Sequence, residues 1–431
     1  MTDAARNTAI EQTATKKEDI VPDPIAAGLK SGWKVTDAST LTSNRDFDVD
    51  VVIVGTGAGG GVTAETLTLA GLKVLMIEEG ALKSSRDFKM READAYPQLY
   101  QESAARKTKD KAINILQGRS VGGSTTVNWT SSFRTPDNTL EYWQKHFGLK
   151  DYTADSLGPW FLMMEQRLNV STWMTPPNEN NDILRRGAAQ LGIPAAAIMR
   201  NVRGCWNLGY CGMGCPTNAK QSMLVTTIPS ALSKGAILIT HARAERLIFK
   251  GDKVSALECV ALTPDGQAPT GKIITVRAKH FVLAGGSINS PGLLLRSKAP
   301  NPSGMLGKRT FLHPTVISAA LFTQKVESYT GAPQTIYSDH FLGIHPIDGP
   351  IGYKLESPPL HPLLLATTMN GFGAEHASLM QQFPHIQSVL ALLRDGFHEQ
   401  SVGGSVELRS DGSAILSCAR LTPSHTNSVI G

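Results

Sequence analysis

Three glycines and one acidic residue in the stretch Val51–Gly80 have the types and spacing to bind a dinucleotide. Gly55, Gly57 and Gly60 match the pattern G-x-G-x-x-G, and Glu78 ends the next predicted strand. The first glycine permits a tight turn, the second lets the backbone approach a pyrophosphate, and the third allows a helix to pack closely on a strand. Glu78 can accept hydrogen bonds from ribose hydroxyls, and its charge would repel the 2′-phosphate of NADP. These residues predict a dinucleotide site but do not separate NAD from FAD.

The elements around these glycines favour FAD. A β-branched run at Val49–Val54 is typical of a buried parallel strand. Short β-rich runs follow between residues 237 and 286, and "GD" at residues 251–252 and "DG" at residues 265–266 are hairpin signals. We predict a three-stranded meander and then one buried strand, Phe281–Ala284, that ends in glycines. An NAD dehydrogenase would instead continue with alternating strands and helices, and it stays the alternative.

The expected fold class is α/β, with mixed α+β character: a Rossmann-like dinucleotide-binding domain with a β-meander, and a substrate-binding domain. We expect a leader that packs onto another part or stays partly mobile at 1–45, and the first part of the dinucleotide domain at 46–150. Substrate-side helices and a cysteine loop follow at 151–215. The second part of the dinucleotide domain, with the meander, is expected at 216–312, and the substrate-binding domain at 313–431.

Composition and charge restrict the partners and the location. The chain has 431 residues and a net charge of +5, and nothing in it indicates nucleic acid as a partner. No run approaches the ~18 apolar residues that span a bilayer, and the N-terminus has no apolar signal core. We expect a cytoplasmic protein. The basic stretch "RKTKDK", Arg106–Lys111, is interpreted as a solvated helix face, with a phosphate or membrane-surface patch as the alternative.

Three blocks in order resemble the glucose–methanol–choline (GMC) family of FAD-dependent oxidoreductases. They are the glycine fingerprint with Glu78, "GRSVGGSTTVNWTSSFR" at Gly118–Arg134, and "AGGSINSPGLLLRS" at Ala284–Ser297. The segment "GYCGMGCPTNAKQSM" is most similar to the branch of long-chain alcohol oxidases and related bacterial dehydrogenases. The resemblance implies bound FAD and oxidation of a primary or secondary alcohol. Hydride passes to flavin N5, the proton passes to a histidine, and the electrons pass to oxygen or another carrier.

The fingerprint and the resemblance together give a set of candidate cofactor-binding residues. Gly122, Gly123 and Ser124 are expected along the ribityl–pyrophosphate part of FAD, Asn128 at the flavin end and Ala244 at the adenine. The full set is Gly55, Gly57, Ala58, Gly59, Gly60, Glu78, Gly118, Arg119, Gly122, Gly123, Ser124, Asn128, Ala244, Ala284 and Gly285. The third block departs from the family at Lys298, where glycine is usual, and we expect this to distort a turn near the cofactor.

A cysteine cluster precedes the second half of the predicted dinucleotide domain. Cys205, Cys211 and Cys215 have the spacing C-x5-C-x3-C. Iron–sulfur and structural zinc sites normally use four ligands, often with C-x2-C spacing, and no fourth cysteine or histidine lies close in sequence. We therefore expect no metal. The cluster is interpreted as a structured loop beside the flavin, with a local disulfide possible in an oxidising compartment.

The general base that alcohol oxidation requires cannot be nominated. The resemblance implies a histidine in a motif similar to H-x-M-G-G near the C-terminus, followed by a second His or Asn, and the sequence contains neither motif. His425 and Asn427 only mimic such a pair, and His313 is more typical of a domain junction. The hypothesis from this pattern is a truncated chain that is inactive. A non-catalytic flavin-binding remnant is the alternative to an active oxidoreductase.

Overall fold

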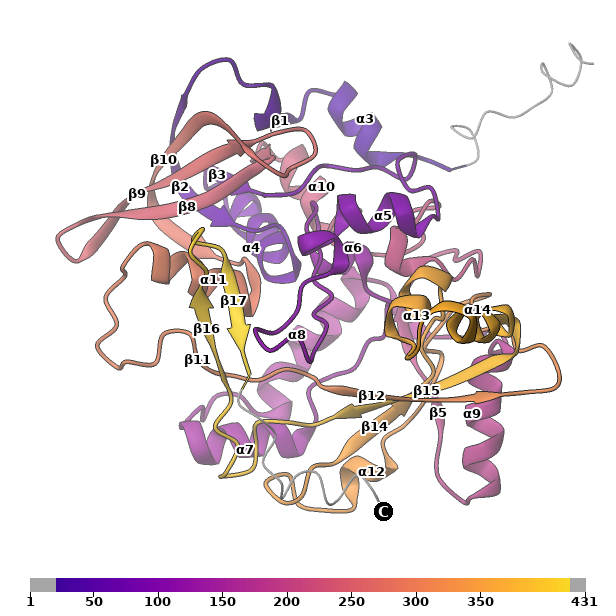
Figure 1. The fold of residues 1–431 in the computed structure, drawn as a ribbon. Coiled ribbons are helices and arrows are strands. Elements are labelled where there is room, and N and C mark those ends of the chain that lie inside the picture. Colours follow the sequence, from indigo (N-terminus) through magenta and orange to yellow (C-terminus); the bar gives the residue numbers. More distant parts are fainter. Residues whose placement is uncertain (1–20, 419–431) are drawn as a thin grey trace, which may run out of the picture.

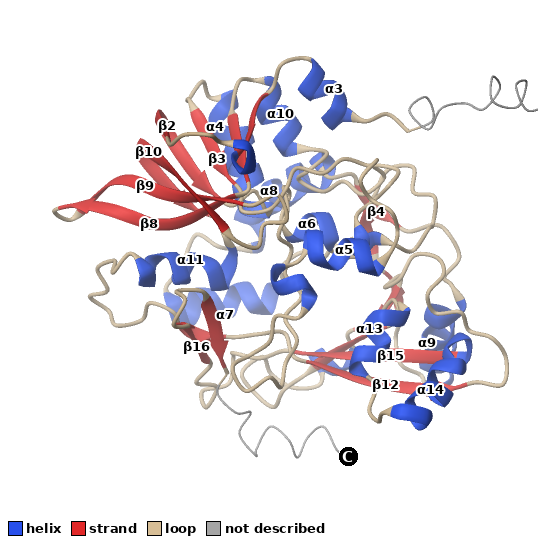
Figure 2. Cartoon of the chain, turned by 45° about the horizontal axis from the view of Figure 1, so that its top comes forward, coloured by secondary structure: helices blue, strands red, loops and turns tan. Residues whose placement is uncertain are grey.

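The computed structural model describes residues 21–418, and His425 and Asn427 lie outside them. Its largest element is a seven-stranded sheet in the order β1-β7-β3-β2-β10-β9-β8. The bounds are β1 Lys34–Asp37, β7 Ile237–Thr240, β3 Val74–Ile77, β2 Arg45–Val54, β10 Pro269–Leu283, β9 Lys253–Leu262 and β8 Ala242–Lys250. The first five strands in this order run parallel, and β10, β9 and β8 pair antiparallel. The last four spread as a fan (Figure 2).

Both faces of the parallel part are covered, which explains its unbroken apolar runs. Val51, Ile53 and Met76 belong to one buried cluster, whereas Val52 and Leu75 belong to another on the opposite face. Helix α4 (Ala58–Leu69) packs on β3 and on α10 (Thr227–Ser233), which also contacts α3 (Pro24–Lys30). Strand β1, which falls within the expected leader, is therefore an integral edge of the sheet.

The meander differs from its prediction in one respect. The turn at Gly251, where φ is 66°, joins β8 to β9 as expected, and the second turn includes Gly266 with φ 70°. However, the third meander strand and the predicted separate strand Phe281–Ala284 form one strand, β10, of 15 residues. Its first part pairs with β9 and its whole length from Ile274 pairs with β2. The polar stretch between the two predicted strands does not break it, because tertiary pairing overrides that local signal.

A second, five-stranded sheet lies apart from the first, at the lower right of Figure 1. Its order is β12 (Thr315–Leu321), β15 (Ile386–Leu393), β14 (Tyr353–Glu356), β13 (Ile336–Ser338) and β5 (Ala196–Ala197). Helix α9 (Glu179–Gln190) packs on β13 and β15. The nearby helices are α12 (His340–Gly343), α13 (Pro362–Thr368) and α14 (Gly373–Gln381).

A C-terminal hairpin belongs to a third, smaller sheet. Strands β16 (Gly404–Leu408) and β17 (Ala414–Ser417) join β11 (Lys308–Thr310) in a small sheet that packs on α11 (Gly286–Arg296). The remaining strands and α-helices of residues 21–418 are the two-stranded pair β4 (Val170–Thr172) and β6 (Met199–Asn201), and helices α5 (Glu92–Leu99), α6 (Ser124–Val127), α7 (Asp137–Phe147) and α8 (Ala154–Arg167). Among the described helices, none is both long and apolar enough to cross a membrane.

Candidate functional site

The turn between β2 and α4 has the geometry that the glycine fingerprint predicts. Gly55 has φ 95°, and a Cβ there would lie 2.5 Å from the main-chain oxygen of Ala284. A Cβ on Gly60 would lie 1.9 Å from the oxygen of Gly55, so only glycine permits the helix to start this close to the strand. Gly57 is the N-cap of α4, and its backbone faces Gly123. The turn therefore exposes the first amides of α4 toward open space.

Glu78 is held by the same turn. Its carboxylate accepts hydrogen bonds from the Thr56 amide at 3.1 Å, the Thr56 hydroxyl at 2.6 Å and the Gly80 amide at 3.0 Å. The Thr56 hydroxyl in turn accepts from the amide of Gly122 at 3.1 Å. Burial raises the pKa of Glu78, because the charged form loses water. Thr56 thus links the acid at the end of β3 to both glycine-rich turns.

The second glycine-rich turn, residues 118–124, lies against the first. Gly122 and Gly123 have φ of 90° and 54°, and a Cβ on Gly123 would lie 2.8 Å from the Cα of Gly57. The amide of Gly118 donates to the Ser124 hydroxyl at 3.0 Å, which closes the turn. Because neither turn carries a side chain at this contact, the backbone amides beside it remain accessible to a ligand that needs hydrogen-bond donors.

Arg119 links the loop of the meander to the end of β3 beside the two glycine-rich turns. Its Nε donates to Oε1 of Glu79 at 2.9 Å, and its Nη2 donates to the main-chain oxygen of Gly266 at 2.5 Å. Glu79 follows Glu78 at the end of β3, and Gly266 lies in the loop between β9 and β10. The side chain therefore bridges the parallel part of the sheet and the meander loop.

These segments line a cavity of about 840 Å³ at the carboxyl ends of β2 and β3. Open parallel sheets bind ligands at this end, and the volume is within the usual range of cofactor sites. The structure places twelve predicted residues on its wall: Gly55, Gly57, Ala58, Gly59, Glu78, Gly118, Arg119, Gly123, Ser124, Ala244, Ala284 and Gly285. Three segments far apart in the sequence thus meet around one space.

Three predicted residues do not line the cavity. Gly60 packs α4 against β2, and Gly122 is buried behind the wall, where it donates to Thr56. Asn128 follows α6, its main-chain oxygen accepts from Lys220 Nζ at 2.9 Å, and its buried Oδ1 has no partner within residues 21–418. Gly60 and Gly122 therefore support the wall of the cavity from behind and are not part of its surface.

Several wall residues were missed by the sequence analysis. The most informative is Arg106, which was interpreted as part of a solvated helix face, whereas the structure buries it outside any helix. Its guanidinium donates to Gln117, Asn289 and the main-chain oxygen of Ala414. No local signal could identify it, because these partners come from three separate segments. Thr56 could have been found, since it lies between the first two glycines.

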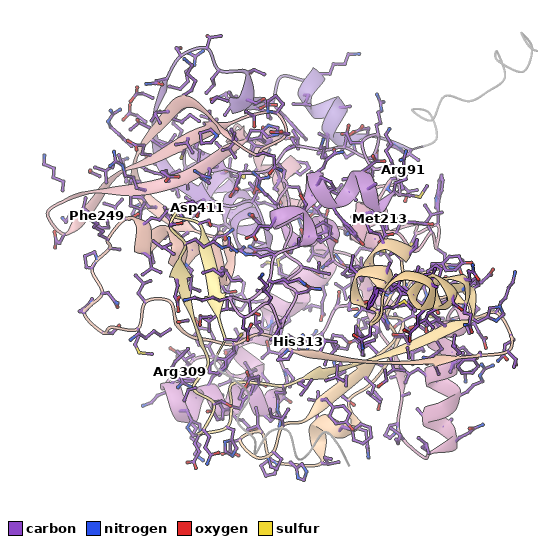
Figure 3. The ribbon with its side chains drawn as sticks, viewed as in Figure 1. Arg91, Met213, Phe249, Arg309, His313 and Asp411 are labelled. Carbon is purple, nitrogen blue, oxygen red and sulfur yellow. The ribbon has the colours of Figure 1, made fainter. Side chains whose placement is uncertain are left out.

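An ion pair joins the far wall to the C-terminal hairpin. Arg409 donates to both oxygens of Glu102, at 3.0 and 3.2 Å. Arg409 and Asp411 lie in the turn between β16 and β17, where Figure 3 labels Asp411. Both residues line the cavity. Glu102 has φ 50° and belongs to a turn that also lines the cavity. The hairpin is therefore part of the site, although its sequence carries no cofactor motif.

Histidines are absent from the described wall of the cavity. His313 lies before β12, away from Asp411 in Figure 3, and burial lowers its pKa. His361 is buried, its pKa is lowered by burial, and its ring stacks on Tyr210. The geometry adds no reason to nominate either as the base.

The departure at Lys298 leaves the turn after α11 in place. Lys298 has φ 50°, in the left-handed region that favours glycine. Its amide donates to Leu295, and that of Ala299 donates to Leu294, at 3.0 Å each. The lysine adopts the conformation that a glycine would adopt there, at some cost in backbone strain.

Comparisons with known proteins agree with this architecture. The family model for GMC oxidoreductase matches residues 96–315. The long-chain-alcohol oxidase FAO1 of Arabidopsis thaliana is 28% identical over 348 residues, which are 78% of this chain and 45% of that protein. An uncharacterised GMC-type oxidoreductase of Mycobacterium tuberculosis is 32% identical over 339 residues, 78% of this chain and 52% of that protein. The chain spans about half the length of these curated relatives.

Solved structures show the same fold. A formate oxidase superposes with a TM-score of 0.62 at 15% identity, and pyridoxine 4-oxidase from Mesorbium loti with 0.60 at 17%. Each comparison covers 88% of this chain and 78% of the other. A mixed α/β fold with a Rossmann-like dinucleotide domain and a second sheet is therefore the class of protein that the structure defines. Within that class, the chain belongs to the GMC oxidoreductase family.

Proposed function

We propose that the chain binds FAD in the 840 Å³ cavity and belongs to an oxidoreductase that acts on the CH–OH group of alcohols. The observation that carries this proposal is the meeting of three glycine-rich segments around one space. At Gly55, Gly60 and Gly123 a Cβ would collide with backbone. Side chains are thus absent where two backbone segments and a cofactor must approach one another.

The wall offers groups suited to each part of FAD. The free amides and dipole at the N-terminus of α4 would hold the pyrophosphate, together with the backbone of Gly123 and Ser124. Glu78 retains acceptor capacity for ribose hydroxyls, since its three donors use only part of two carboxylate oxygens. Ala244 would contact the adenine, and Asn128 remains our candidate for the flavin end.

Bound FAD would accept a hydride from the alcohol carbon. The chain's own residues would fix the orientation of the cofactor, because its pyrophosphate and ribose would be bound by a rigid strand–turn–helix unit. The family resemblance also requires a base for the hydroxyl proton. We nominate no described residue for that role.

The substrate and acceptor are proposed only by class. The relatives include long-chain-alcohol oxidases, so a primary or secondary alcohol and oxygen or another carrier are the expected partners. We also propose that the chain divides into domains at 46–150, 151–215, 216–312 and 313–431. We further propose a cytoplasmic location, with the membrane surface as the alternative.

An absorption and fluorescence titration of the purified chain with FAD tests the proposal. Gly57→Val is the informative variant, because a side chain there would enter the cavity while its Cβ meets protein only at 3.9 Å. We expect FAD affinity to fall by at least about tenfold, with the thermal unfolding of the unliganded chain unchanged. Gly158→Val is the matched control, since a Cβ at Gly158 meets no atom within 4 Å and lies outside the cavity.

Three results separate the possible functions. FAD binding followed by anaerobic bleaching with an alcohol supports the full proposal. FAD binding without bleaching by any alcohol supports a non-catalytic flavin-binding protein. Binding of NADH with no affinity for FAD would refute the cofactor assignment and favour the NAD-linked alternative.

A further inference from the structure

Two segments that lie far apart in the sequence meet on one wall of the cofactor cavity. One is the stretch at residues 101–106, and the other is the turn between β16 and β17 at residues 409–413. The hairpin turn is fixed by Arg296 of α11, on which the hairpin packs (Figure 1). The guanidinium of Arg296 donates to the main-chain oxygens of Ala244, at 2.9 Å, and of Gly412, at 3.2 Å. The two segments therefore face the part of the cavity that we assign to adenine.

A bidentate ion pair joins these two segments. Arg409 donates from Nη1 to Oε1 of Glu102 at 3.0 Å and from Nη2 to Oε2 at 3.2 Å. Both side chains are partly exposed, Arg409 by 31% and Glu102 by 38%. On the inner side, Nε of Arg106 lies 3.6 Å from the same carboxylate, and its Nη2 donates to the main-chain oxygen of Ala414 at 2.8 Å. Glu102 therefore lies between a buried arginine of its own segment and a partly exposed arginine of the hairpin.

The turn that carries Glu102 has a strained backbone. Glu102, Ser103 and Ala104 follow one another with φ of 50°, 54° and 65°. Residues other than glycine are disfavoured in this left-handed region, because their Cβ crowds the following carbonyl oxygen. Such strain persists only where surrounding contacts hold the segment, and the pair with Arg409 is one of those contacts. Loss of the pair would therefore favour a relaxed turn of different shape.

A second ion pair joins the hairpin to the residues that follow this turn. Lys109 Nζ lies 2.7 Å from Oε2 of Glu407, and the amide of Lys109 donates to the main-chain oxygen of Leu416 at 2.9 Å. Neither Lys109 nor Glu407 lines the cavity. These contacts would keep the strands of the hairpin attached when the pair between Glu102 and Arg409 breaks. Opening would then be confined to the two turns that face the cavity.

We propose that the pair between Glu102 and Arg409 is a clasp that closes the cavity over the adenine end of FAD and sets the rate at which the cofactor leaves. This inference rests on the proposed function, since it requires FAD in this cavity. With the clasp formed, the two turns complete the wall. With the clasp broken, the strained turn relaxes and the wall opens, while the glycine-rich turns and Glu78 keep their contacts. The clasp therefore controls the release of the cofactor and not the contacts to its pyrophosphate.

The rate of FAD release from the loaded full chain tests the clasp. The loaded chain is diluted into buffer without cofactor, and the change in flavin fluorescence gives the rate. We expect Glu102→Gln and Arg409→Met each to release FAD about threefold faster than wild type or more, as expected for loss of a partly exposed ion pair. The double variant should release FAD no faster than either single variant, because one interaction is lost in all three. Glu407→Gln is the matched control, since it breaks the pair with Lys109 and should leave the rate unchanged.

Ala104→Gly tests the strained turn in the opposite direction. Glycine adopts the φ of 65° found at this position without a steric penalty, so the closed form is favoured. Release of FAD should therefore be slower than in wild type. A pair that only stabilised the chain would not produce rates that change in opposite directions in Glu102→Gln and Ala104→Gly.

The outcomes distinguish the clasp from the proposed function. If the wild-type chain has no affinity for FAD, the proposed function fails, and the clasp fails with it. If the wild type binds FAD but Glu102→Gln releases it at the wild-type rate, the clasp alone is refuted. The clasp is also refuted if Glu407→Gln accelerates release as much as Glu102→Gln does, because general loosening of the hairpin would then explain both. Circular dichroism reports the folding of each variant, and if Glu102→Gln does not fold, Arg409→Met and Ala104→Gly still decide the matter.

Discussion

The hydroxyl of Thr56 offers the sharpest test of how the two glycine-rich turns are held together. It donates to the Glu78 carboxylate at 2.6 Å and accepts from the Gly122 amide at 3.1 Å, with all three groups buried. Thr56→Val keeps the shape of the side chain and removes both bonds. A hydrogen bond to a charged group contributes about 1.5–3 kcal/mol, and a buried amide left without a partner costs about 1–3 kcal/mol. We expect the free energy of unfolding to fall by about 3 kcal/mol or more.

Urea unfolding followed by circular dichroism measures this change. Thr66→Val is the matched control, because Thr66 is exposed on α4 and the same substitution there should change stability by less than about 0.5 kcal/mol. The double variant Thr56→Val/Glu78→Gln isolates the pair, and the two substitutions should couple by more than about 0.5 kcal/mol.

The refuting result is specific. If Thr56→Val unfolds at the same urea concentration as Thr66→Val, the hydroxyl does not link the turns. If Thr56→Val is destabilised but its effect adds to that of Glu78→Gln without coupling, the hydroxyl acts through Gly122 alone. Either result would remove the argument that Glu78 is held in place by the fingerprint turn.

Three further predictions follow from single side chains. Lys298→Gly should raise the free energy of unfolding by about 0.5–1 kcal/mol, because it relieves a left-handed lysine, whereas Lys234→Gly, at a helix end with φ −98°, should not raise it. Burial raises the pKa of Glu78 in the folded chain, so folding favours the protonated carboxyl group. The stability that this preference contributes is fully present below the pKa of Glu78 in the unfolded chain, and it is lost as pH rises through the pKa in the folded chain. Wild type should therefore lose stability relative to Glu78→Gln as pH rises above 4.5, in paired melts across that range. Arg119→Met should cost about 1 kcal/mol and make the β9–β10 loop more susceptible to limited proteolysis, since both of its bridging contacts are lost.

The sequence by itself determined those parts of the site that are formed by a few consecutive residues. Gly55 and Gly60 are required by a turn and a helix start only a few residues long, so their spacing was sufficient to predict the geometry. The meander turn at Gly251 follows from the same kind of local rule. The acid at the end of β3 was also predictable, because strand and acid are contiguous.

The tertiary structure decided the rest, because it brings together segments that no local pattern connects. Arg106 belongs to a basic stretch that the sequence predicts to be a solvated helix face. In the structure its side chain is buried and donates to Gln117, Asn289 and the main-chain oxygen of Ala414. The pair between Glu102 and Arg409 joins residues more than three hundred positions apart. Backbone conformation is set largely by residue type over a few positions, whereas burial and charge pairing depend on which distant surface the fold places opposite a side chain.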